Sequence, residues 1–266
     1  VTKWVGRVDR ADLIPEYTRR AYTHLRSGRP GPVLLLIPRD LGEYDADEHP
    51  YAPVKGWRTG PDPDDVKAAI RALLAAKDPL LHVGEGVCYA DAAAELLQFA
   101  EAAQIPVLTT LKAKGVFPEN HPLSVGVRGS MADHFLRKCD LLFSIGSSLF
   151  PGRFSHTVPD AHKKTIVQCT VDTLDINRSY ETRHAVIGDA KLTLPALVQE
   201  LGSKGGRKKP EVLEEIKGQR QAFKDKFRPW LESNETPINP YRVFGDLAKV
   251  LDPKSSFLTA DSGNTR

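Results

Sequence analysis

The chain has 266 residues, of which 41% are hydrophobic and 27% are charged, a composition typical of a globular protein with one large or two medium domains. Its formal net charge of +3 is too small to favour a nucleic-acid partner, and we interpret the one dense basic cluster, KGGRKKP at 204–210, as a solvated linker. No apolar run approaches the roughly 18 residues of a membrane span and the N-terminus has no signal-peptide pattern, so we expect a cytoplasmic protein that does not bind a membrane.

The first 41 residues predict one helix, at roughly 11–26, followed by one strongly apolar strand at 33–37. Such a strand needs cover on both faces and neighbours on its edges. Segments of about 40 residues seldom fold alone. We therefore expect residues 1–41 to be part of a larger α/β domain, separated by a linker at 42–60 from the central part of the chain.

Residues 61–202 alternate short apolar strands with amphipathic helices, which predicts a parallel, doubly wound α/β sheet covered on both faces. Asp62-Pro63-Asp64-Asp65 is a helix start, since Asp caps the first turn and acids face the positive end of the helix dipole. The expected helices begin at about 62 and 90 and include 194–201, and the expected strands lie at 80–83, 106–110, 141–145, 165–171 and near 185–187.

A second linker at 203–210 leads to residues 211–266, which we expect to form only the first part of a further domain. Asn239-Pro240 starts a helix with an apolar face, and a strand is expected at 257–260. We therefore infer one complete domain between two partial ones.

The strand at 80–83 runs into Gly84-Glu85-Gly86 and then a helix, an arrangement in which small residues let a phosphate approach the backbone amides. The third glycine of the dinucleotide fingerprint would fall at 89, which is Tyr, and the next strand ends in Thr110 rather than an acid. A nucleotide contact and a plain tight turn both remain open, and we do not expect classical NAD binding.

Other strand ends are expected at the same edge of the sheet: Gly146-Ser147, Asp172 and the segment 111–127. The cations Lys112, Lys114, Arg128 and Arg153 can meet an anionic diphosphate there, with ordinary surface charge as the alternative. Asp172 and Asp175 are paired carboxylates or, as we favour, a helix cap, and we assign His121 to loop packing. No catalytic constellation is found, and the three cysteines, expected to be buried, lack metal-ligand spacing.

Five stretches in series resemble the thiamine-diphosphate-dependent enzymes of the acetolactate synthase type. SGRPGPVLLLIPRDL is similar to the close of that family's pyrimidine-binding domain. IPVLTTLKAKGVFPENHPLSVGVRG, CDLLFSIGSSL and VIGDAKLTLPAL are similar to its central domain, and NPYRVFGDLAKVLDPKSSFLTADSGN to the opening of its diphosphate-binding domain. The central segment departs from the synthases at 149–156, where LFPGRFSH replaces an FDDRVTG-like run.

The resemblance implies a central six-stranded parallel sheet at 61–202, between the end of the pyrimidine-binding domain (1–41) and the start of the diphosphate-binding domain (211–266). It implies a thiamine-diphosphate- and Mg-dependent lyase or carboligase acting on a 2-oxoacid or acyl substrate, as a homo-oligomer. The glutamate that activates the cofactor is expected before Val1 and the GDG-plus-Asn metal motif after Arg266. We therefore expect this chain to be inactive without the missing domains or a second subunit.

The resemblance also assigns two sets of cofactor-binding residues. The thiamine diphosphate set is Ser262, Gly263, Asn264 and Thr265. The central domain holds FAD or an ADP moiety in some members, and its matching positions are Gly84, Gly86, Thr110, Leu111, Lys112, Gly126, Arg128, Gly146, Ser147, Arg153 and Asp172.

Two other functions remain open. The chain could be a non-catalytic FAD- or ADP-binding α/β domain whose flanks dock partners, or a structural oligomerisation module. Flavin colour in the purified protein would favour the first of these.

Overall fold

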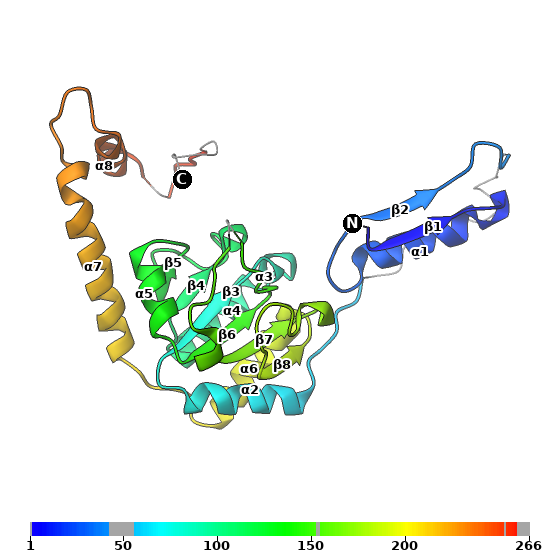
Figure 1. Cartoon of the computed structure of the whole chain (residues 1–266), viewed down its shortest axis with the longest axis horizontal. Coiled ribbons are helices and arrows are strands. Elements are labelled where there is room, and N and C mark those ends of the chain that lie inside the picture. Colours follow the sequence, from blue (N-terminus) through cyan, green and yellow to red (C-terminus); the bar gives the residue numbers. More distant parts are fainter. Residues whose placement is uncertain (1, 43–55, 153–154, 253, 260–266) are drawn as a thin grey trace. The chain divides into compact units, whose positions relative to one another are not determined.

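The computed structural model describes residues 2–42, 56–152, 155–252 and 254–259. The chain divides into two compact units, Val1–Ile216 and Lys217–Arg266. The larger unit holds a central sheet with its helices and a small N-terminal α/β element, and the smaller one holds most of α7 and all of α8 (Figure 1).

The central sheet has six parallel strands in the order β5-β4-β3-β6-β7-β8, which confirms the predicted doubly wound sheet. Its middle is dry: Leu81, Phe143 and Val167 are register neighbours on three adjacent strands and have no exposed surface. The strands are β3 (Pro79–Val83), β4 (Val107–Thr109), β5 (Ser124–Gly126), β6 (Leu141–Ile145), β7 (Thr165–Thr170) and β8 (His184–Ile187).

Edge strand β5 lies inside the segment 111–127, in which no strand was expected from the sequence. Three residues, Ser-Val-Gly, are too few to give an apolar run, so periodicity does not reveal this strand. His121, in the same segment, accepts a hydrogen bond from Leu123 N and packs on Phe117, in agreement with its predicted packing role.

The helices α2 (Pro63–Ala75), α4 (Ala93–Ala103) and α6 (Ala190–Ser203) pack on one another and cover one face of the sheet, where Phe99 of α4 meets Phe143 of β6. Asp62 caps α2 through Asp64 N, as predicted, and Asp189 caps α6 in the same way. The short α3 (Gly86–Tyr89) follows β3, and α5 (Ser130–Lys138) packs against β5.

The connection from β6 to β7 is unusual for a parallel crossover, which is ordinarily helical. Among its described residues it contains only the 3-10 turn Ala161–Lys163. Irregular segments of this length are commonly functional in compact domains. The connection is therefore a candidate part of a binding site.

The N-terminal element consists of two parallel strands, β1 (Trp4–Arg7) and β2 (Val33–Leu36), joined through a 3-10 turn (Ala11–Leu13) and α1 (Ile14–Arg26). α1 covers one face. Val5, Leu34 and Leu36 are 53%, 44% and 46% exposed, so an apolar surface stays open. Strand β1 was not predicted from the sequence, and the exposed side chains agree with the expectation that β2 needs further cover.

The interpretation of the basic cluster at 204–210 as solvated is wrong at Arg207, which is buried. Its guanidinium donates to the carbonyl oxygens of Ala103, Gln104 and Lys77 at 3.1–3.3 Å. These are carbonyls at the ends of two helices that would otherwise lack partners. The basic residue therefore fastens the segment to the central unit.

In the smaller unit, α7 (Glu211–Leu231, beginning in the larger unit) and α8 (Pro240–Val250) meet through the aromatic rings of Phe227, Trp230 and Tyr241. Asn239 caps α8, as the sequence predicted. The strand expected at 257–260 is wrong for its described part: residues 257–259 are not paired, and Phe257 and Leu258 are exposed. A strand needs a neighbour, and none is present among the described residues.

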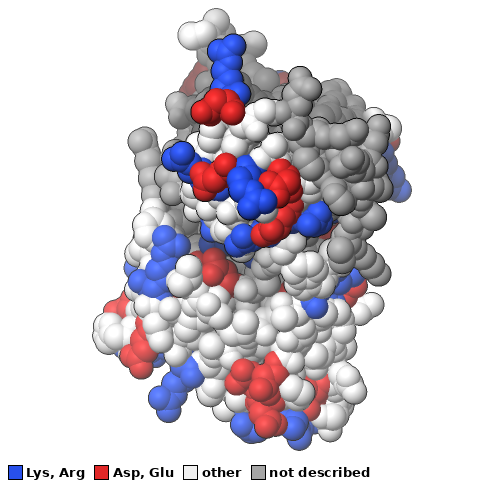
Figure 2. Space-filling view, turned by 90° about the vertical axis from the view of Figure 1, so that its right-hand side faces the viewer, with Lys and Arg blue, Asp and Glu red and all other residues white. Residues whose placement is uncertain are grey.

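Charged side chains of both signs share one face of the molecule. On the face shown in Figure 2, Lys and Arg side chains are interspersed with Asp and Glu rather than gathered by sign. None of the helices described here is both long and apolar enough to cross a bilayer. Cys139 and Cys169 are buried as expected, whereas Cys88 is exposed.

Candidate nucleotide-binding site

The order of the strands reverses at the centre of the sheet. β3 leads outward to β4 and β5, whereas its other neighbour β6 leads outward to β7 and β8. The loops that leave the carboxyl ends of β3 and β6 therefore diverge, and in open α/β sheets ligands bind in the crevice that this divergence creates.

Gly84, Gly86 and Gly146 bring the two central turns into backbone contact at this position. A Cβ on Gly84 would lie 2.2 Å from the carbonyl oxygen of Gly146, and one on Gly86 would lie 2.8 Å from the Gly146 Cα. Gly146 also has φ +64°, a backbone conformation that residues with a side chain rarely adopt. The glycines are thus required by the close approach of the two turns, whether or not a ligand is bound.

A cavity of about 830 Å³ opens above these turns. Its size lies within the roughly 300–1,000 Å³ of small-molecule and cofactor sites. The loops after β3, β4, β6, β7 and β8 form its walls, together with residues at the end of α1 and the segment 56–59. The N-terminal segment therefore supplies part of a site that is otherwise built by the central sheet.

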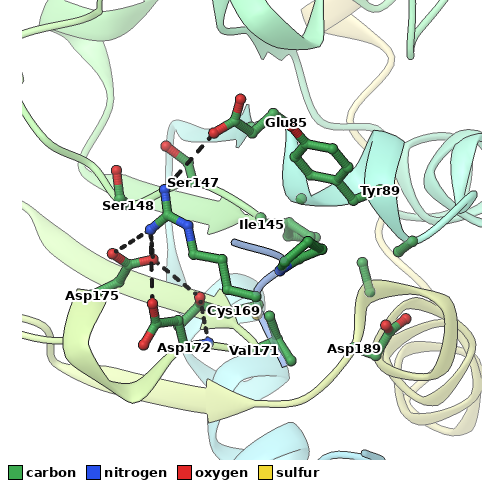
Figure 3. A pocket seen from close by; sticks show the side chains of 18 of the residues that line it. Glu85, Tyr89, Ile145, Ser147, Ser148, Cys169, Val171, Asp172, Asp175 and Asp189 are labelled. Atoms are coloured by element: carbon green, nitrogen blue, oxygen red, sulfur yellow. Dashed lines mark hydrogen bonds and ion pairs between the residues drawn. The ribbon is translucent and has the colours of Figure 1, made fainter. Parts of the chain in front are cut away.

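Arg29 reaches into the cavity and is surrounded by three carboxylates. Its Nη1 lies 3.2 Å from Asp175 Oδ1 and 3.8 Å from Asp172 Oδ2, and its Nη2 lies 3.8 Å from Glu85 Oε1. Figure 3 shows the carboxylates of Glu85, Asp172 and Asp175 facing one point, with Asp189 set apart. Burial raises the pKa of Asp175, and the charge of Arg29 acts in the opposite direction.

The cavity wall carries as many cationic side chains as carboxylates. Besides the Arg29 cluster, Lys112 Nζ lies 3.2 Å from Glu85 Oε2, and Arg58 Nε lies 3.9 Å from Asp189 Oδ2. These three cations are all substantially exposed, so their ion pairs are weak and a stronger anionic partner can replace them. The lining cations are Arg26, Arg29, Arg58 and Lys112, and the lining carboxylates are Glu85, Asp172, Asp175 and Asp189.

The buried His82 and the half-buried His156 form another part of the wall. His82 Nε2 and His156 Nδ1 are 3.1 Å apart, and His156 Nε2 donates to the carbonyl oxygen of Val127 at 2.7 Å. Burial, with a smaller contribution from His156, lowers the pKa of His82 to about 3, and burial also lowers the pKa of His156. Both rings are therefore neutral near pH 7.

The structure brings eight of the predicted nucleotide-site residues together on the cavity wall. Gly126, the last residue of edge strand β5, and Arg128, which follows this strand, are not among its lining residues, and Arg153 lies outside the described residues. Ser262, Gly263, Asn264 and Thr265, predicted to approach thiamine diphosphate, also lie outside the described residues. The eight are Gly84, Gly86, Thr110, Leu111, Lys112, Gly146, Ser147 and Asp172.

Sequence reasoning missed Arg29, His82 and His156. Arg29 stands in the SGRPGPV stretch, far from the central sheet in sequence, and only the fold brings it to the cavity. The sequence does mark His82 as a candidate site residue, because it is the one polar side chain in the strand PLLHV. Asp172 does cap a turn, through Leu174 N, but Asp175 is a buried partner of Arg29 and Thr170 rather than a second cap.

Among the described residues, no group of three or more His, Cys, Asp or Glu side chains is arranged to hold a metal ion. The thiols do not suggest nucleophiles either, because burial raises the pKa of Cys139 to about 11 and also raises the pKa of Cys169.

Residues 66–197, which contain all six strands of the central sheet, match the family model described as "Thiamine pyrophosphate enzyme, central domain". The chain belongs to the thiamine-diphosphate-dependent enzyme family. This confirms the resemblance drawn from the five sequence stretches.

Relatives in this family match nearly the whole chain. A Methanocaldococcus jannaschii protein named "Probable acetolactate synthase large subunit" is 32% identical over 100% of this chain and 47% of its own length. The glyoxylate carboligase of Escherichia coli O157:H7 is 31% identical over 97% of this chain and 45% of its own length. The chain thus spans about half the length of these relatives.

A solved structure shares the fold. Benzoylformate decarboxylase from Polynucleobacter necessarius superposes with a TM-score of 0.60 and 28% identity, covering 74% of this chain and 38% of that protein. The chain therefore shares its fold with part of this decarboxylase.

Proposed function

We propose that the chain is part of a thiamine-diphosphate- and Mg²⁺-dependent enzyme that cleaves or forms a carbon–carbon bond beside the carbonyl of a 2-oxoacid or acyl substrate. The observation that carries this proposal is the similarity of nearly the whole chain, in one continuous order, to an acetolactate synthase and a glyoxylate carboligase. The parent protein is proposed to be a cytoplasmic homo-oligomer.

The proposed division is an end of a pyrimidine-binding domain at 1–41, a central domain at 61–202 and a start of a diphosphate-binding domain at 211–266. The open apolar surface of β1 and β2 supports the first boundary, because Leu34 and Leu36 lack cover among the described residues. The unpaired residues 257–259 support the last. Linkers at 42–60 and 203–210 separate the three parts.

Thiamine diphosphate would be approached by Ser262, Gly263, Asn264 and Thr265, and it supplies an electron sink for the carbanion left by carbon–carbon cleavage. These four residues lie outside the described part of the chain, so no catalytic step is assigned to them. We expect the isolated chain to show no turnover of 2-oxoacids with thiamine diphosphate and Mg²⁺.

The cavity at the centre of the sheet is proposed to bind a nucleotide, FAD or an ADP moiety. Three features fit such a ligand. The turns at Gly84–Gly86 and Gly146 place glycines, which have no side chain, on the cavity wall, Arg29 and Lys112 can pair with phosphate oxygens, and Asp172, two residues after β7, can accept hydrogen bonds from ribose hydroxyls. The volume of about 830 Å³ is sufficient for a ligand of this class.

Nucleotide binding without catalysis is a second candidate function. It is favoured by one observation: every described residue that lines the cavity lies within residues 25–193, in the larger unit. In this case the chain would be an FAD- or ADP-binding module with a structural or partner-docking role.

The deciding measurements are titrations of the purified chain with FAD, followed by its visible absorbance, and with ADP, followed by calorimetry. Saturable binding of either supports the nucleotide site. Absence of both contradicts it. Release of CO₂ or carboligation by this chain alone would contradict the proposal that it lacks essential parts of the catalytic site.

A further inference from the structure

His82 is a buried polar group in an apolar strand. It is 3% exposed, stands in the middle of β3 between Leu81 and Val83, and lines the cavity. Buried polar side-chain atoms nearly always have a hydrogen-bond partner, so each ring nitrogen requires an explanation.

The hydrogen bonds of the pair fix where its protons lie. The carbonyl oxygen of Val127 can only accept, so His156 Nε2 must carry a proton. His156 is neutral, so its Nδ1 carries a lone pair and accepts from His82 Nε2 at 3.1 Å. In neutral His82 the proton is then on Nε2, and Nδ1 is left as a bare acceptor.

His82 Nδ1 has no partner in the structure. Among the described residues, three buried side-chain polar atoms lack a hydrogen-bond partner, and they are His82 Nδ1, Ser144 Oγ and Thr193 Oγ1. Two of the three residues, His82 and Thr193, line the cavity. Ser144 is the register neighbour of His82 on β6 and lies on the same face of the sheet. An unsatisfied acceptor at a ligand-sized cavity indicates that a bound molecule completes it.

We propose that the His82–His156 pair is a ligand-recognition element of the cavity, which accepts a hydrogen bond from an uncharged N–H or O–H group on the non-phosphate part of the nucleotide. This inference rests on the proposed nucleotide-binding function and specifies one contact within it. Val127 and His156 act as positioning residues, because they hold His82 in the tautomer that accepts.

The same arrangement determines which part of the ligand this end of the cavity rejects. A phosphate or carboxylate oxygen offers only lone pairs to another lone pair, so it leaves His82 Nδ1 unsatisfied and is disfavoured. The cations Arg29 and Lys112 provide the favourable position for phosphate. The ligand is therefore oriented with its anionic part toward Arg29 and a neutral donor group toward His82.

The first test is the nitrogen resonance of His82 in long-range ¹H–¹⁵N spectra of the whole chain. We expect the Nε2–H tautomer in the free protein, and a change in the Nδ1 resonance to that of a hydrogen-bonded acceptor when FAD or ADP is added to saturation. A proton on Nδ1 in the free protein would overturn the proposal. So would an Nδ1 resonance that does not respond to saturating FAD and ADP.

Ser144 provides the internal alternative. If its hydroxyl already donates to His82 Nδ1, the free protein will show a hydrogen-bonded acceptor and Ser144→Ala will abolish that signal, which overturns the proposal. If Ser144→Ala leaves the Nδ1 resonance of the free protein unchanged, the acceptor is reserved for the ligand.

The second test is affinity. His82→Leu should lower the affinity for the nucleotide, FAD or ADP, that changes the Nδ1 resonance. The expected loss is about tenfold, the effect of one neutral hydrogen bond, and the affinity for inorganic pyrophosphate should stay unchanged. His121→Leu, a histidine away from the cavity, is the matched control and should bind as the parent does. Unchanged nucleotide binding by folded His82→Leu overturns this inference alone, whereas no binding of FAD or ADP by the parent chain overturns the proposed function with it. If His82→Leu does not fold, the resonance of the parent protein decides.

Discussion

Gly86 N donates a hydrogen bond to the carbonyl oxygen of Gly146 at 2.9 Å and thereby ties the turn after β3 to the turn after β6. These turns lie at the point where the strand order reverses, and they form the floor of the cavity. The geometry of the proposed nucleotide site thus depends on a contact between two backbones that leaves no room for side chains.

Gly84→Ala should destabilise the protein by about 1–3 kcal/mol, because the new methyl would lie 2.2 Å from the carbonyl oxygen of Gly146 and the backbone would have to move. Urea unfolding followed by circular dichroism measures this. Gly202→Ala is the control, since nothing lies within 4 Å of its Cβ position at the end of α6. Equal stability of the two variants would contradict the packing argument.

Arg207→Ala should lower the free energy of unfolding by about 2–3 kcal/mol, since it leaves the carbonyls of Ala103, Gln104 and Lys77 without their charged donor. The exposed neighbour Lys208→Ala should have almost no effect. Thermal and chemical unfolding of both variants test this, and a harmless Arg207→Ala would restore the interpretation of 203–210 as a simple solvated linker.

His82→Leu should make stability less sensitive to acid. The pKa of His82 is about 3 in the folded protein against an ordinary value of 6.5, so between these values the unfolded chain binds more protons and stability falls as the pH falls. Removing the imidazole should reduce this slope by about 1.4 kcal/mol per pH unit below pH 6. Unfolding series from pH 7 to pH 4.5 measure the slope, and Ser144→Ala, which changes packing without a titrating group, should keep the parental value.

Arg29→Ala should weaken the binding of ADP or FAD by about tenfold or more. The substitution removes the cation proposed to meet phosphate and leaves Glu85, Asp172 and Asp175 to repel it. The loss should be greatest at low salt, where these charges are least screened. Arg19→Ala, an exposed position on α1 outside the cavity, is the control. Equal affinities at low salt would show that Arg29 does not bind the phosphates.

The parts of the fold that short sequence patterns specify, namely apolar strands and helix caps, were predicted from the sequence. Five strands of the central sheet are short apolar runs and the caps Asp62 and Asn239 have the residue types that helix starts require, so both were correctly located. Strands β1 and β5 were not predicted, because each has only three or four residues and contains glycine. The strand at 257–260 was predicted from its composition, yet pairing depends on a neighbour that composition does not supply.

The site was predictable where chain connectivity places it and not where tertiary contact does. Gly84, Gly146 and Asp172 follow strands, so the rule for parallel sheets brings them to one edge. Arg29 is 146 residues from its closest partner Asp175, and no local signal joins them. The neutrality of His82 depends on burial and on His156, which are likewise properties of the folded chain.

Because Arg29 and the segment 56–59 form one wall of the cavity, trimming the protein to its parallel sheet would separate folding from recognition. A shortened polypeptide starting near Pro61 would include all six strands of the central sheet, yet it would lack Arg29 and residues 56–59, so its crevice would be open to water on that side. Screens that judge domain boundaries by solubility or melting temperature alone would select such a version and miss its defect.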